Sequence, residues 1–199
     1  MVSRETKARQ LVIAAIGSRV NVNECGNRAC VEVGAPYQVD WRKPGTYALV
    51  LRADKACIVQ VGRLGRLLVK PGFYVYVGSA RGPGGVAARV GHHHRQSPRR
   101  RWHIDYLRRH AHPFEVWWTH DAERRECSWG CLMASLARAR TPQIGFGASD
   151  CRCLSHLTWF ADAPCFDAFQ DRLQDACPRH GAVWVTGAVR ESLPAGVMK

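Results

Sequence analysis

The chain has 199 residues, a formal net charge of +13 at pH 7 and a pI near 9.8. This length suits one well-buried domain with extensions and argues against a second full domain. The charge favours an anionic polymer or surface as a partner, the alternative being a solvated basic surface without one. No stretch is long enough for a membrane span, and the apolar run at 11–16 is too short for a signal-peptide core. We therefore expect a cytoplasmic protein whose nine cysteines are reduced.

Residues 1–40 carry no motif with a chemical meaning, and we expect an N-terminal extension of unknown role there. Short runs of β-branched and aromatic residues between Gly and Pro then predict three strands, at 47–51, 57–61 and 73–77. These strands would pair in sequence order as an antiparallel meander. The expected fold class is α/β or α+β, with a central three-stranded antiparallel sheet flanked by helices.

Six further elements are predicted in chain order: a helix at 86–94, a helix at 102–110, a strand at 114–119, a helix at 122–140, a helix at 164–176 and a small strand at 183–186. The helix at 122–140 has the clearest periodicity. Its shared face is predicted to consist of Glu126, Cys127, Cys131, Leu132, Ser135 and Leu136. We place the core domain at 41–161 and a C-terminal helical extension at 162–199.

Two tyrosines are the first candidates for chemistry. Tyr47 and Tyr76 each stand two residues from a glycine on a predicted strand. Neighbouring strands can hold two phenols on one face, and glycine leaves room for a ligand to approach the backbone. Downstream lie a guanidinium, imidazoles and one carboxylate, on Arg89, His92, His93, His94 and Glu126. This set of groups suits hydrolysis of a phosphodiester on a metal ion.

The elements Gly45-Thr-Tyr47 and Tyr76-Val-Gly78, with the following Arg89, resemble those that define the GIY-YIG nuclease superfamily. Within it, the chain is most similar to the DUF123 or Uri-type endonuclease subgroup. Four segments carry that resemblance in order: 74–80, 102–107, 126–127 and 146–156. The resemblance covers roughly residues 41–160. It implies a small GIY-YIG-like core and a metal-dependent endonuclease that hydrolyses DNA.

The resemblance also implies a role for each candidate. Glu126 would be the ligand of Mg²⁺ or Mn²⁺, ions that are commonly held by one carboxylate together with waters and substrate oxygens. Arg89 would stabilise the negative charge of the transition state. Tyr47 would position the attacking water or accept its proton, and Tyr76 would line the same face. His93, one helical turn after Arg89, would deprotonate water or protonate the leaving group. Taken singly, such residues are more often core tyrosines or members of surface ion pairs.

The chain departs from the superfamily pattern at two places. Ser79 stands where lysine often follows the second motif, so that cation is either missing or replaced by Arg81 or His92. An additional strand-like segment, 57–68, separates the two tyrosine motifs. The alternative function is therefore a catalytically inactive nucleic-acid-binding module on the same scaffold.

A basic stretch is the candidate for contact with the DNA backbone. Arginines would neutralise phosphates and a tryptophan would stack on an exposed base, which assigns Arg81, Arg95, Arg99, Arg100, Arg101 and Trp102 to nucleic-acid binding. Branched or damaged DNA would fit as the substrate. Trp102 could equally anchor a helix with its arginines in water. Asp105 would orient an imidazole or cap a loop.

Thiols and an imidazole lie close together near the end of the domain. Cys151, Cys153 and His156 suggest a structural zinc site, with Cys127 or Cys131 as the fourth ligand. Cysteine is also a common small buried residue, and these thiols would then simply fill the core. If the cysteines matter more than the tyrosines, the protein is a zinc-stabilised interaction protein.

Overall fold

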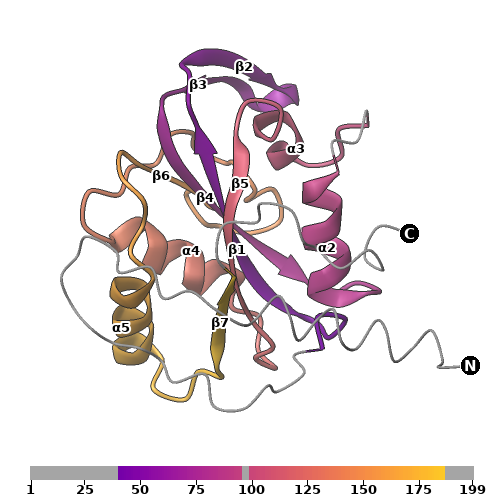
Figure 1. Ribbon diagram of the computed structural model, residues 1–199, viewed down its shortest axis with the longest axis vertical. Helices are drawn as coiled ribbons and strands as arrows, with labels where there is room; N and C mark the ends of the chain where they lie inside the picture. The colour runs from indigo at the N-terminus through magenta and orange to yellow at the C-terminus, as the bar shows by residue number, and fades with distance from the viewer. Residues whose placement is uncertain (1–39, 96–98, 187–199) are drawn as a thin grey trace, which may run out of the picture. The chain divides into compact units, whose positions relative to one another are not determined.

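The computed structural model describes residues 40–95 and 99–186, and the described residues from Trp41 onward lie in one compact unit (Figure 1). The predicted N-terminal extension, apart from Asp40, and the last residues of the chain lie outside this described part. Within the described residues, no helix is both long enough and apolar enough to cross a membrane.

The centre of the fold is a five-stranded antiparallel sheet with the strand order β6-β4-β1-β5-β7. Its strands are β1 (Gly45–Ala53), β4 (Gly72–Ala80), β5 (His112–Thr119), β6 (Leu157–Phe160) and β7 (Val183–Thr186). The central strand, β1, is buried over nearly its whole length because it has a partner on each side and helices over both faces. This mixed α/β architecture has more strands than the expected three.

The predicted meander is wrong in its pairing. The second predicted strand is β2 (Cys57–Val61), which pairs with β3 (Gly65–Val69) in a separate two-stranded sheet across the short 3-10 turn η1 (Gly62–Leu64). β1 pairs instead with β4, from Gly45 opposite Ala80 to Ala53 opposite Gly72. Both strands have nine residues, so each fully satisfies the other's hydrogen-bonding edge, which the five-residue β2 could not do.

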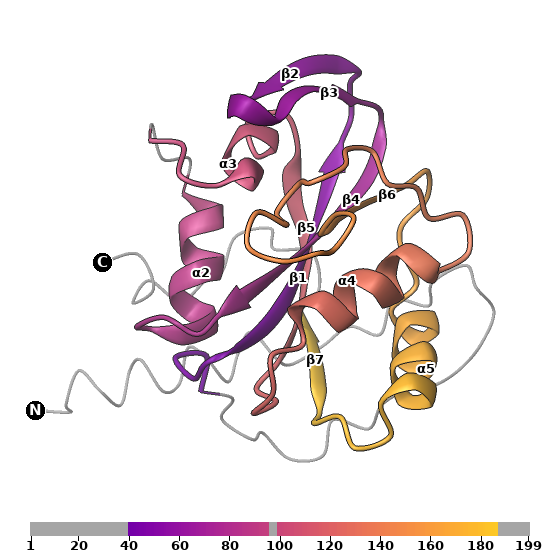
Figure 2. The same cartoon turned by 180° about the vertical axis from the view of Figure 1, so that it is seen from behind.

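Four helices cover the main sheet on its two sides (Figures 1 and 2). On one side are α2 (Gly85–His94) and α3 (His103–Leu107), and on the other are α4 (Glu126–Ser135) and α5 (Phe166–Ala176). Alternation along β1 sends Ala48 and Val50 into the core beneath α4 and α5 and leaves Tyr47 facing α2. The helix at 86–94 and the strand at 183–186 are confirmed, and the strand at 114–119 and the helix at 164–176 lie within or around β5 and α5.

The longest predicted helix is shorter than expected, and the face that it buries differs from the predicted one. An Asx-type turn, in which the Glu123 N–H donates to the Asp121 carboxylate, precedes α4, and Leu136 is already extended. Its buried residues are Trp129, Gly130 and Met133, whereas Cys127 and Cys131 are exposed. Of the face predicted around the cysteines, Leu132 and Leu136 do pack against the core, but Cys127 and Cys131 do not, because the bulkier Trp129 and Met133 take the buried positions. The helix predicted at 102–110 is reduced to the five residues of α3.

Candidate functional site

Tyr47 lies directly over a glycine of the neighbouring strand. Tyr47 on β1 is opposite Gly78 on β4. A Cβ atom at Gly78 would lie 2.5 Å from the Tyr47 hydroxyl oxygen and 2.6 Å from Cζ of the same ring. The sequence suggested that this glycine makes room for a ligand. The structure shows that the room is taken by the side chain of Tyr47 itself.

A short hydrogen bond joins Tyr47 to the last turn of α2. The Tyr47 hydroxyl is 2.7 Å from Nε2 of His93, and the two residues are only 2% and 3% exposed. The ring of Tyr76 packs edge-on against both, with ring centroids 6.4 Å from Tyr47 and 6.1 Å from His93. These three rings, which come from β1, β4 and α2, form a buried aromatic centre.

Burial keeps this centre neutral. Burial is the largest cause that raises the pKa of Tyr47 well above its usual value; Tyr76 and Glu126 raise it further, and Arg89 lowers it. Burial also lowers the pKa of His93 to about 3, helped by the positive charges of neighbouring groups. At neutral pH the hydrogen bond therefore joins an un-ionised phenol to a neutral imidazole. Tyr47 cannot act as a preformed phenolate base in this environment.

Two opposite charges act on the aromatic centre. Arg89 on α2 lowers the pKa of Tyr47 and of Tyr76, and Glu126 at the start of α4 raises both, although burial is the largest cause for each phenol. Both charged residues are partly exposed, with the Glu126 side chain at 25%. The structure therefore brings Tyr47, Tyr76, Arg89, His93 and Glu126 into one electrostatic neighbourhood.

Trp102 makes contacts within the protein. The guanidinium carbons of Arg89 and Arg101 lie 4.4 and 5.4 Å from its ring centroid, and the ring of His92 packs against it at 4.6 Å. Stacking on Arg89 orients that guanidinium beside the aromatic centre. One face of the predicted base-stacking residue is thus already in use.

The other arginines that were predicted to contact DNA have different environments in the structure. The guanidinium of Arg100 lies 5.0 Å from the ring of Tyr106, and Arg95 and Arg99 are exposed. Arg81 donates from Nη2 to the carbonyl oxygens of Asp121 and Ala122, at 3.2 and 2.8 Å. Arg81 therefore tethers the segment that leads into α4.

Asp105 fills both of the roles considered for it. Its Oδ2 accepts the backbone N–H groups of Arg101 and Trp102, at 2.8 and 2.9 Å, and so caps α3. Its Oδ1 lies 3.1 Å from Nε2 of His92. The same carboxylate therefore fixes the basic stretch and the histidine that packs on Trp102.

A buried arginine that sequence reasoning missed supports His93. Arg108 donates from Nε to the carbonyl oxygen of His93 and from Nη1 to that of Ala111, both at 2.6 Å. Burial lowers its pKa to about 10, so it stays charged at neutral pH. It satisfies a carbonyl in the last turn of α2, where helices lack internal partners. In the sequence it is one more arginine in a basic stretch, and nothing marks it as buried.

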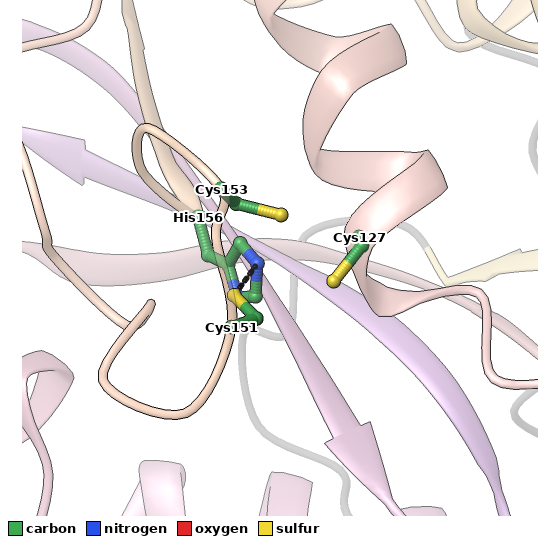
Figure 3. Close-up of side chains that lie close together, drawn as sticks. All are labelled: Cys127, Cys151, Cys153 and His156. Atoms are coloured by element: carbon green, nitrogen blue, oxygen red, sulfur yellow. Dashed lines mark hydrogen bonds between the residues drawn. The ribbon is translucent and has the colours of Figure 1, made fainter.

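The predicted thiol cluster forms beside Glu126. Ligand atoms of Cys151, Cys153 and His156, in the segment before β6, and of Cys127 on α4 all lie within 4.8 Å of one another (Figure 3). Nδ1 of His156 is 3.4 Å from Oε1 of Glu126. Burial alone would lower the pKa of His156, but the carboxylate of Glu126 and the thiol of Cys151 outweigh it and raise that pKa.

Comparison with known proteins places the chain in a family without assigning it an activity. No curated protein and no solved structure matches it. The sequence model of one family, described as a domain of unknown function, matches residues 46–177. The match spans more than half of the chain and includes the aromatic centre, Arg89, Glu126 and the thiol cluster. The chain therefore belongs to the DUF123 family.

Proposed function

We propose that this protein is a GIY-YIG-type endonuclease that hydrolyses DNA phosphodiester bonds with Mg²⁺ or Mn²⁺. The observation that carries the proposal is the hydrogen bond between Tyr47 and His93, with Arg89 and Glu126 acting electrostatically on the same phenol. Arg89 and Glu126 lie 42 and 79 positions after Tyr47 in the sequence, yet both act on the same buried phenol, and neither charge is needed to fill the core. The resemblance of the two tyrosine motifs to the GIY-YIG superfamily supports the same reaction.

Glu126 fits the role of the metal ligand. Its carboxylate is partly exposed, so water and a phosphate oxygen can reach it, and Mg²⁺ commonly uses one or two carboxylates together with such oxygens. A divalent ion there would neutralise charge on the scissile phosphate and on the leaving oxygen.

The chain's own residues would orient the reactants. Because Tyr47 and His93 are both neutral, proton transfer from the phenol to the imidazole before attack is strongly uphill. Tyr47 would instead use its oxygen to align the attacking water while its hydrogen bond to His93 holds the ring in place. Arg89, held over Trp102, would place its charge against the transition state, a contact typically worth about 3–4 kcal/mol.

The overall charge supports a nucleic-acid substrate. The net charge of +13 is concentrated in arginine, which matches phosphate geometry in a bidentate way. Arg100 and Arg101 lie on the segment that Asp105 fixes next to Trp102 and Arg89. A DNA backbone bound along this segment would therefore pass close to the proposed catalytic groups.

The test is metal-dependent cleavage. The full-length protein is incubated with supercoiled plasmid and with branched or flapped oligonucleotides in Mg²⁺, Mn²⁺ or EDTA. We expect nicking in Mg²⁺ or Mn²⁺ only, and a loss of at least about a hundredfold in Glu126→Gln, Arg89→Ala and Tyr47→Phe.

Matched variants separate chemistry from folding. Glu123→Gln removes an exposed carboxylate three residues before Glu126. Tyr74 lies on the same strand as Tyr76, and Tyr74→Phe removes its buried hydroxyl, which accepts a hydrogen bond from the Lys70 N–H. Both variants should keep full nicking activity. Tight, salt-sensitive DNA binding without any cleavage would contradict the proposal and favour the inactive binding module.

A further inference from the structure

Four side chains from two distant segments point into one small volume. Figure 3 shows the sulfurs of Cys127, Cys151 and Cys153 around the imidazole of His156, with Cys127 projecting from the first turn of α4. Cys131, one turn further along the same helix, is exposed and is not part of this group. The alternative that the sequence left open between Cys127 and Cys131 is thus decided by geometry in favour of Cys127.

The spacing of these atoms suits tetrahedral coordination. Zinc–sulfur bonds of about 2.3 Å and zinc–nitrogen bonds of about 2.0 Å give ligand atoms about 3.5–3.8 Å apart. Sγ of Cys151 is 3.4 Å from Nε2 of His156, and all four ligand atoms fall within 4.8 Å of one another. Side-chain adjustments of about an ångström would close the set around one ion.

We propose that Cys127, Cys151, Cys153 and His156 bind one zinc ion, which joins the first turn of α4 to the segment before β6 and thereby positions Glu126. Three thiolates and one imidazole are soft and borderline ligands that select zinc over Mg²⁺. On binding, the three thiols release their protons to solvent and His156 binds as the neutral ring. The seven cysteines in the described residues are free thiols, so none of these ligands is committed to a disulfide.

The packing of α4 is adapted to this site. A Cβ atom at Gly130 would lie 3.3 Å from Cδ2 of His156, which is closer than most side chains approach. Glycine therefore lets the backbone of α4 lie against the imidazole. Cys127 is three residues earlier in the helix and so faces the same side. The helix thus supplies one proposed ligand, Cys127, and leaves the space that a second, His156, occupies.

His156 would connect the zinc ion to Glu126. Its Nε2 faces the thiols, while its Nδ1, which is buried and lacks a well-aligned hydrogen-bond partner, is 3.4 Å from Oε1 of Glu126. Metal-bound histidines commonly donate their second N–H to a carboxylate, which fixes ring and carboxylate together. This arrangement would leave Oε2 of Glu126 for Mg²⁺. The zinc site itself does not depend on the proposed nuclease function, whereas its effect through Glu126 rests on that function.

Metal analysis of the full-length protein, purified without a histidine tag or chelator, tests the site directly. We expect one zinc per chain in the wild type and in Cys131→Ser, and a clear loss of zinc in Cys151→Ser and Cys153→Ser. Only a substoichiometric trace of zinc in the folded wild type, or full zinc in a Cys151→Ser/Cys153→Ser double variant, would overturn the proposal.

Cobalt replacement keeps the test valid where a cysteine variant fails to fold. Zinc in the wild-type protein is exchanged for Co²⁺, whose absorption spectrum distinguishes tetrahedral thiolate coordination from octahedral oxygen coordination. We expect the thiolate spectrum in the wild type and in Cys131→Ser. An oxygen-type spectrum would contradict the proposed ligand set.

The effect on Glu126 has its own readout. Zinc-depleted but folded protein should need about 10–100 times more Mg²⁺ for half-maximal nicking, the usual size of an effect transmitted through an outer-shell contact. An unchanged Mg²⁺ dependence would refute the positioning effect. If zinc is stoichiometric and no DNA is ever cut, the proposed function is wrong while the zinc site stands.

Discussion

Replacing Gly78 by alanine tests whether the close approach of Tyr47 to the β4 backbone governs the candidate site. The new methyl carbon would lie 2.5 Å from the Tyr47 hydroxyl and 2.6 Å from Cζ, whereas carbon atoms in contact prefer about 3.5–4.0 Å. The Tyr47 ring cannot relieve this overlap by moving out into solvent, because it is only 2% exposed. The phenol would have to move away from Gly78, which would stretch its hydrogen bond to His93.

The expected cost follows from this overpacking. An extra methyl group in a full core costs about 1–3 kcal/mol. For a domain of this size that loss of unfolding free energy lowers the melting temperature by roughly 2–4 °C per kcal/mol. Urea denaturation and thermal melting of the full-length Gly78→Ala protein measure the effect. The nicking activity that we propose should fall as well, because the displaced Tyr47 hydroxyl would no longer be held by its hydrogen bond to His93.

Gly82→Ala is the matched control. A Cβ atom at Gly82 meets no heavy atom within 4 Å, and that backbone is not in the left-handed region. Its stability should change by no more than a few tenths of a kcal/mol. In a Tyr47→Ala background the cost of Gly78→Ala should largely disappear, since the clashing ring is gone. Equal stability of Gly78→Ala and Gly82→Ala, or full additivity with Tyr47→Ala, would refute the steric account.

Three further changes have defined outcomes. Arg108→Met should cost about 2–3 kcal/mol in urea denaturation, because it leaves buried carbonyl oxygens without a donor; a cost below that of an exposed Arg66→Met variant would contradict this. The pKa of His93 is about 3 in the folded protein and about 6.5 in the unfolded chain. Below pH 6.5 the unfolded chain therefore binds a proton that the folded protein does not. The unfolding free energy is thus unaffected by this group above pH 6.5 and falls on acidification by up to about 1.4 kcal/mol per pH unit. Stability measured between pH 7 and 4.5 should fall less steeply in His93→Gln than in the wild type. Arg101→Ala should weaken DNA binding and reduce its salt dependence by about one phosphate contact, whereas an unchanged salt slope would place the DNA elsewhere.

Local patterns in the sequence were sufficient for several elements but not for the pairing of the strands. Glycine, proline and β-branched residues marked where β1, β2 and β4 lie. Which strand pairs with which depends on length and burial in the folded sheet, and β1 takes partners from residues 72–80 and 112–119. Adjacency along the chain made the β1–β2 meander the natural prediction, and the matched lengths of β1 and β4 overrule it.

The face of α4 shows a second limit. A spacing of three and four residues fits both the cysteine-containing stripe and the stripe that includes Trp129 and Met133. Periodicity alone gives no reason to prefer one, and the core is filled by the larger apolar side chains. Cys127 is exposed on the helix yet meets Cys151 from another segment, a contact that no pattern within one helix can reveal.

The candidate site was assembled from a resemblance rather than from spacing. Tyr47 and His93 are 46 residues apart, and their hydrogen bond depends on how α2 packs on β1. Arg108 and the carbonyl oxygens it binds left no signal, because a buried and an exposed arginine look the same in a sequence. The low pKa of His93 likewise depends on burial, which sequence composition does not fix.

The position of β1 in the sheet affects how the protein is made. Among the strands of the described residues, the one at the middle of the sheet comes first in sequence, and its neighbours follow up to 73 positions later, as in the pairing of Thr46 with Thr119. During synthesis the nascent β1 therefore leaves the ribosome with its apolar side chains and both hydrogen-bonding edges unpartnered until β4 and β5 emerge. Chaperones that shield extended apolar segments would have their greatest effect on the yield of this chain in that interval.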